Sequence, residues 1–141
     1  MKLFSRLFSK KPAAPSPVEE ASRILERFAT ATSMGVDRED LSRYPAKQRQ
    51  VMAFHFGAIE CLAREFQLDE TQMLGVFVVF LDSYFIMPIT ESGSISERVQ
   101  GFYDKAQERE YLEAGADVFR RWHELNERHA PLQLGEMLQA S

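Results

Sequence analysis

The sequence has little cysteine or histidine, and it contains no apolar run long enough to cross a membrane. The single cysteine, Cys61, excludes an internal disulfide bond and fits a reducing compartment such as the cytoplasm. The longest apolar stretch, residues 73–87, is shorter than the roughly 20 residues that span a bilayer, and it contains Asp82. No continuous apolar segment follows the first lysine, so we expect no secretory signal.

Motifs for catalysis and cofactor binding are also missing. The chain has no G-x-S-x-G, G-x-G-x-x-G or G-x-x-x-x-G-K-[ST] sequence. His123 and Glu127 are four residues apart, but a single pair supplies too few ligands for a metal site. We therefore expect no cofactor and no enzyme activity. The alternative is a small helical enzyme with a pocket beside Asp82, which the sequence predicts to be a buried carboxylate at the edge of the core.

Charge is distributed unevenly along the chain. The first 17 residues contain four basic and no acidic residues, whereas the remainder contains 13 basic and 21 acidic residues, a net charge of -8. Nucleic acid is an unlikely main partner for so acidic a body, because phosphate contacts need a basic face. A nucleic-acid-associated regulator remains a further alternative.

Residues 1–11 have the pattern of a basic amphipathic arm. Their apolar residues recur with helical spacing on one side, and their basic residues lie elsewhere, as in segments that lie on an anionic membrane surface. The alternatives are docking on a partner protein or on the acidic body, or no defined role. The residues expected to make contact are Lys2, Leu3, Phe4, Arg6, Leu7, Phe8, Lys10 and Lys11.

The rest of the chain predicts an all-α fold, a compact bundle of five to six helices with a flexible N-terminal arm. Residues 12–16 are rich in proline and alanine and predict a linker, so residues 17–141 form the single helical domain. Capping residues and apolar stripes predict its elements. These are helices over 17–34 and 45–67, a short turn after Asp37, a helix over 70–87, helices over 95–108 and 110–128, and a closing helix over 131–139.

The helix over 70–87 is predicted to be the centre of the bundle. Asp69 and Gln72 form a capping box at its start, and Pro88 ends it. Apolar residues cover every side of its helical wheel, so we expect other helices to surround it. Thr71, Gly75 and Asp82 form a narrow seam on which glycine would permit close approach of another helix.

The boundary between the next two helices is drawn where the apolar stripe fails, across residues 107–110. One long bent helix over 95–128 is the alternative. Near the end of this region, Arg120, Arg121 and Trp122 are residue types common in interface hot spots, and they form a candidate partner surface. The competing interpretation is that Trp122 anchors the C-terminal helices to the core.

Together these patterns favour a non-enzymatic protein-protein interaction function. We interpret the protein as an adaptor or accessory subunit, cytoplasmic and held peripherally at the inner face of a membrane by residues 1–11. Its expected partner is another protein or a second copy of itself, as a homo-oligomer.

Overall fold

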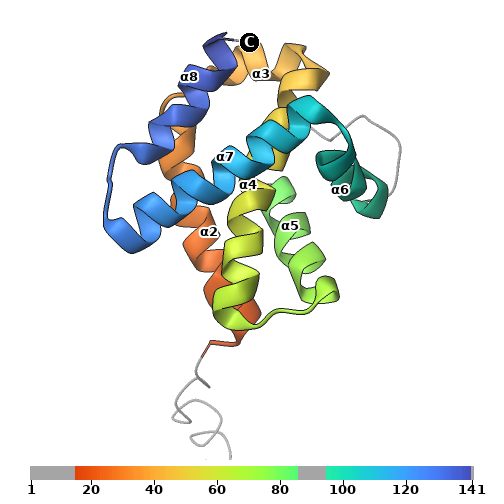
Figure 1. Ribbon diagram of the computed structural model, residues 1–141, viewed down its shortest axis with the longest axis vertical. Helices are drawn as coiled ribbons and strands as arrows, with labels where there is room; N and C mark the ends of the chain where they lie inside the picture. Colours follow the sequence, from red (N-terminus) through yellow and green to blue (C-terminus); the bar gives the residue numbers. More distant parts are fainter. Residues whose placement is uncertain (1–14, 86–94, 141) are drawn as a thin grey trace, which may run out of the picture.

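The computed structural model describes residues 15–85 and 95–140, and it confirms the all-α class. Within these residues there is no strand, and the helices pack as a bundle (Figure 1). The predicted contacts of residues 1–11 and the predicted stop at Pro88 lie outside the described residues. The elements are α2 (Pro17–Ser33), α3 (Arg38–Arg43), α4 (Pro45–Phe66), α5 (Glu70–Tyr84), α6 (Ile95–Asp104), α7 (Ala106–Leu125), the 3-10 turn η1 (Ala130–Leu132) and α8 (Gln133–Ala140).

Local capping residues set the starts of three helices as predicted. The Ser16 hydroxyl accepts a hydrogen bond from the Glu19 N–H at 3.2 Å and begins α2. The Asp37 carboxylate accepts from two backbone N–H groups of α3. At the start of α5, Asp69 and Gln72 form the reciprocal capping box, with bonds of 2.8 and 2.9 Å. Because a cap satisfies N–H groups that the helix itself leaves open, it fixes the boundary locally.

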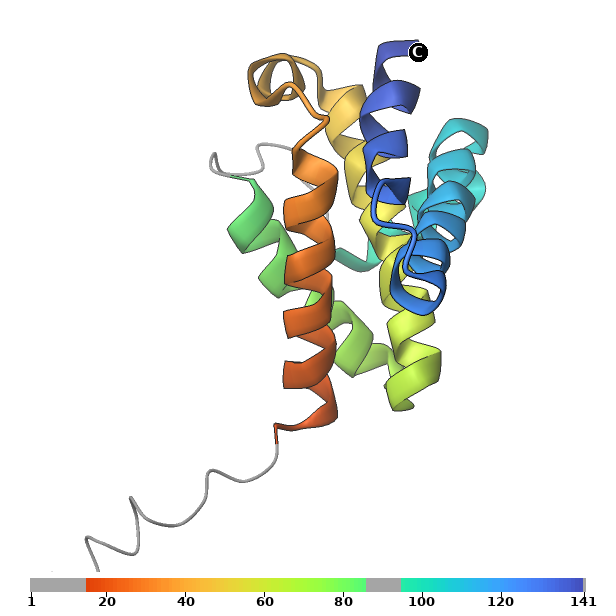
Figure 2. The ribbon, with the colours of Figure 1, turned by 90° about the vertical axis from the view of Figure 1, so that its left-hand side faces the viewer.

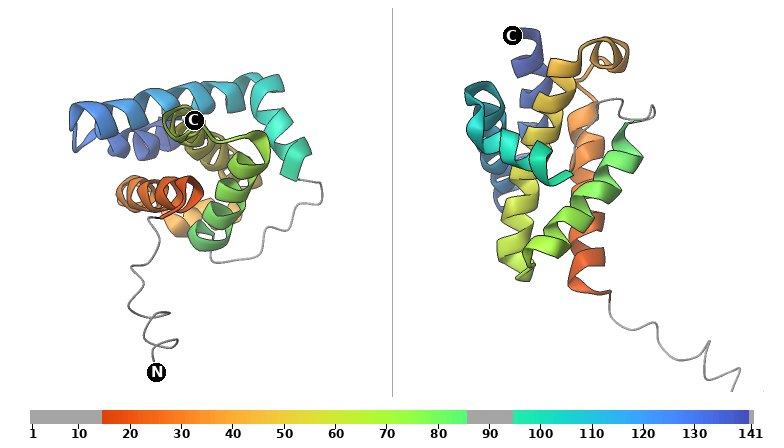
Figure 3. Two further views of the ribbon diagram at one scale, coloured as in Figure 1. Left: turned by 90° about the horizontal axis from the view of Figure 1, so that it is seen from below. Right: turned by 90° about the vertical axis from the view of Figure 1, so that its right-hand side faces the viewer.

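The helix at the centre of the bundle is α4, so the prediction that the apolar helix over 70–87 is central is wrong. Side chains from Gln50 to Ile59 are buried without interruption, and α4 packs against α2, α3, α5, α6, α7 and α8. Figure 3 shows α4 between α7 on one side and α2 and α5 on the other. The helices that contact α5 lie on only one of its sides, so the apolar residues on its other side are not covered within the described structure.

Two glycines allow α4 and α7 to cross at very short range. A β-carbon on Gly57 would lie 2.1 Å from the Leu112 carbonyl oxygen, and one on Gly115 would lie 1.8 Å from the Phe54 carbonyl oxygen. No larger residue fits at such a backbone contact without separating the helices. This crossing fixes the position of α4 beneath α7 and leaves the opposite side of α4 for α2 and α5.

The break between α6 and α7 is confirmed, but it lies at Lys105 rather than within residues 107–110. The polar run that suggested the later position contains a buried residue. Glu108 is only 6% exposed, and its carboxylate forms an ion pair with Arg49 of α4 at 3.5 Å. The run therefore lies within α7, and only Glu108 among its residues packs against α4. A paired charge looks like a solvent-facing residue in sequence because its partner is far away along the chain.

Candidate functional site

A groove with a volume of about 640 Å³ lies between α2 and α5. In Figure 2 α5 runs obliquely upward behind α2, and the two helices are in contact. The groove has an apolar floor of buried side chains and a rim of exposed ones. The floor residues are Leu25, Ala29, Val76, Phe80 and Tyr84, and the rim includes Glu19, Arg23, Glu26, Val79 and Ser83.

The outward side of α5 continues this groove as a surface with two exposed valines among small and polar residues, which we call the α5 outer face. It comprises the exposed residues Thr71, Gly75, Val78, Val79 and Asp82. Val78 is 47% exposed and Val79 is 55% exposed, and Val79 also lines the groove. A β-carbon on Gly75 would find no atom within 4 Å, so nothing in the described structure requires glycine there.

Two sequence predictions about this helix are therefore wrong. Asp82 is exposed, so it is not a buried carboxylate. The seam of Thr71, Gly75 and Asp82 faces solvent instead of a neighbouring helix. The physical reason is that the bundle packs on the opposite side of α5, where Val76, Phe77 and Phe80 are buried.

None of the helices in the described part of the chain has the length and apolar character needed to span a membrane.

Arg38 closes one end of the groove. Its guanidinium donates a hydrogen bond to the backbone carbonyl of Tyr84, the last residue of α5, and lies 4.6 Å from the centre of the Tyr84 ring. The carbonyls of the last helical turn have no partner within the helix, so a cation at this end satisfies one and opposes the helix dipole. Arg38 therefore ties α3 to α5 and holds the end of the groove in place.

The groove rests on a buried histidine. His55 of α4 is fully buried, with Nδ1 2.8 Å from the Val51 carbonyl oxygen and Nε2 2.8 Å from the Thr32 hydroxyl. A carbonyl can only accept, so Nδ1 carries the hydrogen and the Thr32 hydroxyl donates to Nε2. Burial lowers the pKa of His55 to about 4, and the bond to Val51 opposes that shift. The imidazole is neutral near pH 7 and serves packing beneath Phe80 and Tyr84.

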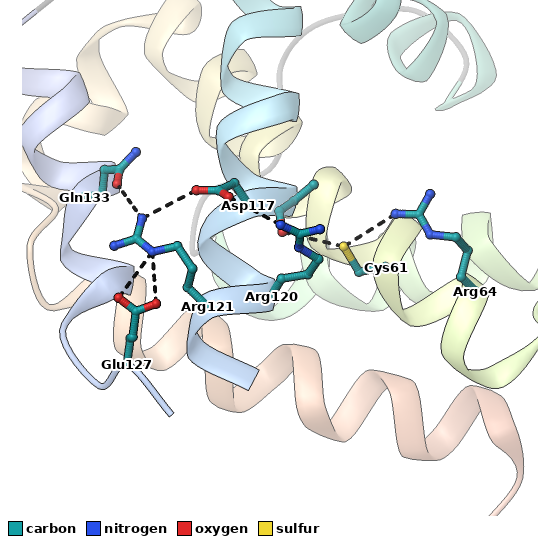
Figure 4. Close-up of polar contacts among 8 residues, drawn as sticks. Cys61, Arg64, Asp117, Arg120, Arg121, Glu127 and Gln133 are labelled. Atoms are coloured by element: carbon teal, nitrogen blue, oxygen red, sulfur yellow. Dashed lines mark hydrogen bonds and ion pairs between the residues drawn. The ribbon is translucent and has the colours of Figure 1, made fainter. Parts of the chain in front are cut away.

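The predicted partner surface at the end of α7 is largely used inside the fold. Trp122 packs on Phe28 of α2, with ring centres 5.3 Å apart, and on Phe119. This packing matches the interpretation that Trp122 anchors the C-terminal helices to the core. Arg121 bonds Glu127 and Gln133 and so fastens the turn between α7 and α8 (Figure 4). Of the three residues, only Arg120 has an exposed side chain, which pairs with Asp117.

Cys61 and His123 make structural contacts. The Cys61 thiol donates to the Ala116 carbonyl at 3.6 Å, and burial raises its pKa (Figure 4). His123 bonds Glu65 of α4 at 3.0 Å, whereas Glu127 pairs with Arg121. The two residues whose spacing suggested metal ligands therefore have different partners. Within residues 15–85 and 95–140 no group of three or more histidine, cysteine or acidic side chains is placed to hold a metal ion.

No protein-family model, curated protein or solved structure matches this chain. The groove and the α5 outer face were not predicted from the sequence. Val78 and Val79 lie within the run taken as wholly buried. The signal that could have found them is the solvent-facing stripe of small and polar residues on either side of the two valines. Arg38 carries no comparable signal, because its partner Tyr84 is 46 residues away.

Proposed function

We propose that the protein is a non-enzymatic adaptor or accessory subunit that binds an amphipathic helix of a partner protein. The observation that carries this proposal is the half-exposed pair Val78 and Val79 beside an open groove with an apolar floor. Apolar surface left open next to a groove is typical of helix-in-groove recognition, in which residues of one helix face insert between two helices. The exposed Gly75 adds a place where a partner backbone could approach closely.

The charges around this surface favour a partner helix with basic residues beside its apolar face. Glu26 and Asp82 are exposed, and within the described residues neither forms an ion pair. The nearby cations are already engaged: Arg23 pairs with Glu20 at 4.0 Å, and Arg38 is held by Tyr84. The lining itself is neutral, with two glutamates and two arginines, and the net negative charge of the site comes from Glu20 and Asp82 beside it. That charge favours association with a basic partner.

A comparison of two point variants tests the docking site. Val79→Glu places a charge on the groove rim, whereas Leu125→Glu changes a somewhat more exposed apolar residue at the far end of α7. We expect a protein that co-purifies with the native chain to be retained by Leu125→Glu and lost from Val79→Glu. Equal retention by the two variants would contradict the site. Sedimentation velocity of the same samples shows whether the partner is a second copy of the chain.

We also propose that residues 1–11 hold this adaptor peripherally at the cytoplasmic face of a membrane. The support is the sequence pattern, in which Phe4 and Phe8 share an apolar side with two leucines and four basic residues surround them. Each basic residue near an anionic surface contributes about 1 kcal/mol. We expect the native chain to co-sediment with vesicles that contain phosphatidylserine, and a smaller fraction to co-sediment at high salt. The double variant Phe4→Asp, Phe8→Asp should not co-sediment. Sedimentation of the double variant at the native level would refute the proposal.

A further inference from the structure

The groove between α2 and α5 begins where the N-terminal arm joins the body. Its first lining residues are Val18 and Glu19, one and two positions after Pro17 at the start of α2. It then follows α2 as far as Ser33. The residues that precede α2 in the chain are thus tethered at the mouth of an apolar groove.

The chemistry of residues 1–11 matches what the groove lacks. The proposed partner is a helix with apolar residues on one side and basic residues beside them, and residues 1–11 have this pattern. The groove presents an apolar floor, and its rim carries the exposed carboxylates of Glu19 and Glu26 together with Arg23, which pairs with Glu20 at 4.0 Å. Lys10 and Lys11 are close in sequence to the first of these carboxylates, and Arg6 precedes them by about one helical turn.

The lengths also match. Because Ser16 caps α2, the chain free to turn back runs only as far as residue 15, and residues 12–15 span up to about 14 Å when extended, which is enough to cross one helix diameter of about 10 Å. Eleven helical residues are about 16 Å long, and the stretch of α2 from Val18 to Ser33 is about 22 Å long. The arm can therefore turn back along α2 and lie within the groove.

We propose that residues 1–11 occupy the α2–α5 groove of their own chain and mask the docking site. Leu3, Phe4, Leu7 and Phe8 contact the apolar floor, and the basic residues lie beside Glu19 and Glu26. A partner helix or a membrane must compete with this internal ligand, whose short linker gives it an effective concentration in the millimolar range. This inference rests on the proposed function of the groove as a docking site, and it adds the regulation of that site.

A spin label on the arm tests the internal contact directly. The full chain carries Cys61→Ser and Ser5→Cys, with the label on the new cysteine, and the amide signals of Ala29, Val79 and Ser83 are recorded. We expect these signals to lose most of their intensity. The matched control adds Phe4→Asp and Phe8→Asp, which keeps the tether but removes the apolar contact, and its signals should recover. Equal broadening in the two proteins would overturn the proposal.

Mixing distinguishes the internal ligand from a second copy. Spin-labelled chain at natural isotope abundance is mixed with isotope-labelled chain that carries no spin label. The total protein concentration is the same as in the first measurement. We expect no broadening of the groove signals in this mixture. Broadening at the strength seen within one chain would show that the occupant is the arm of a second copy, and the internal assignment would fall.

A competition measurement separates this inference from the proposed function. A free peptide of residues 1–11 is titrated into the native chain and into the full chain carrying Phe4→Asp and Phe8→Asp. We expect the double variant to bind the peptide at least about tenfold more tightly than the native chain does, because its internal competitor is gone. Adding Val79→Glu to the double variant should abolish this increase in affinity. Equal affinities would overturn the internal masking. Loss of partner binding in Val79→Glu alone would still support the docking site.

Discussion

Gly115 of α7 packs directly against the backbone carbonyl of Phe54 in α4. A β-carbon at Gly115 would lie 1.8 Å from that oxygen and 2.6 Å from the carbonyl carbon. The two helices touch through backbone at this point, and the position of α4 within the bundle depends on the contact.

Gly115→Ala is expected to destabilise the protein strongly. The added methyl group meets rigid backbone atoms, so α4 and α7 must separate and the packing around Phe119 and Val118 must open. Overpacking of a core typically costs about 1–3 kcal/mol, and a clash with backbone lies at the upper end or beyond. Urea denaturation should show a loss of about 3 kcal/mol in the free energy of unfolding. A loss well below about 1 kcal/mol would contradict this close crossing.

Gly75→Ala is expected to have the opposite effect on folding. The new β-carbon on α5 finds no atom within 4 Å, and alanine favours a helix interior over glycine by about 1 kcal/mol. The free energy of unfolding should therefore rise by about that amount. If a partner helix approaches α5 closely at this position, the same variant should bind it more weakly although it is more stable. A loss of stability would instead show that Gly75 is packed within the monomer.

Acid should destabilise the protein through His55. Burial lowers its pKa in the folded protein to about 4, below the ordinary value of 6.5, so between these values the unfolded chain binds a proton that the folded protein excludes. Stability is therefore lost as the pH falls from about 6.5 toward 4, by up to about 3 kcal/mol. The measurement is the free energy of unfolding against pH for the native chain and His55→Gln. The difference between them should shrink as the pH falls, and parallel curves would contradict the account.

Tyr84→Phe should leave stability unchanged or raise it. The Tyr84 hydroxyl oxygen is buried and makes no hydrogen bond of normal geometry among the described residues. Its burial raises the pKa of the phenol, and the nearby Thr32 and Arg38 oppose that shift. A buried hydroxyl without a partner costs about 1–3 kcal/mol, a penalty that phenylalanine removes while keeping the ring contacts. Thermal unfolding of the two proteins provides the comparison. A lower melting temperature for Tyr84→Phe would mean that the hydroxyl is bonded in solution.

The sequence predicted what is determined locally and missed what depends on distant contacts. The starts of α2 and α5 were predicted because Ser16 and Asp69 bond N–H groups within their own first turns. The centre of the bundle was placed on α5 because its mean hydropathy is highest, whereas burial follows from which helices meet. Gly57 and Gly115 allow α4 to pack closely against α7, and the residues that they contact lie 55 or more positions away along the chain.

The candidate site was hidden for the same reason. Val78 and Val79 have the composition of core residues, and only the packing of α5 against α2 and α4 leaves them outside. Trp122 has the composition of an interface residue, yet Phe28 and Phe119 cover part of it. Residue type describes what a side chain can do, but the arrangement of helices decides which surface it occupies.

Hydrogen–deuterium exchange of the full chain carrying Phe4→Asp and Phe8→Asp, in which the arm no longer covers the groove, tests the docking site most directly when it is measured with and without a protein that co-purifies with the chain. The account predicts slower exchange within Pro17–Ser33 and Glu70–Tyr84, which line the groove and carry the α5 outer face, and little change at the C-terminal end of α7. Slower exchange around Arg120 and Arg121, with the two groove helices unchanged, would contradict the account and place the partner on the surface that the sequence first indicated.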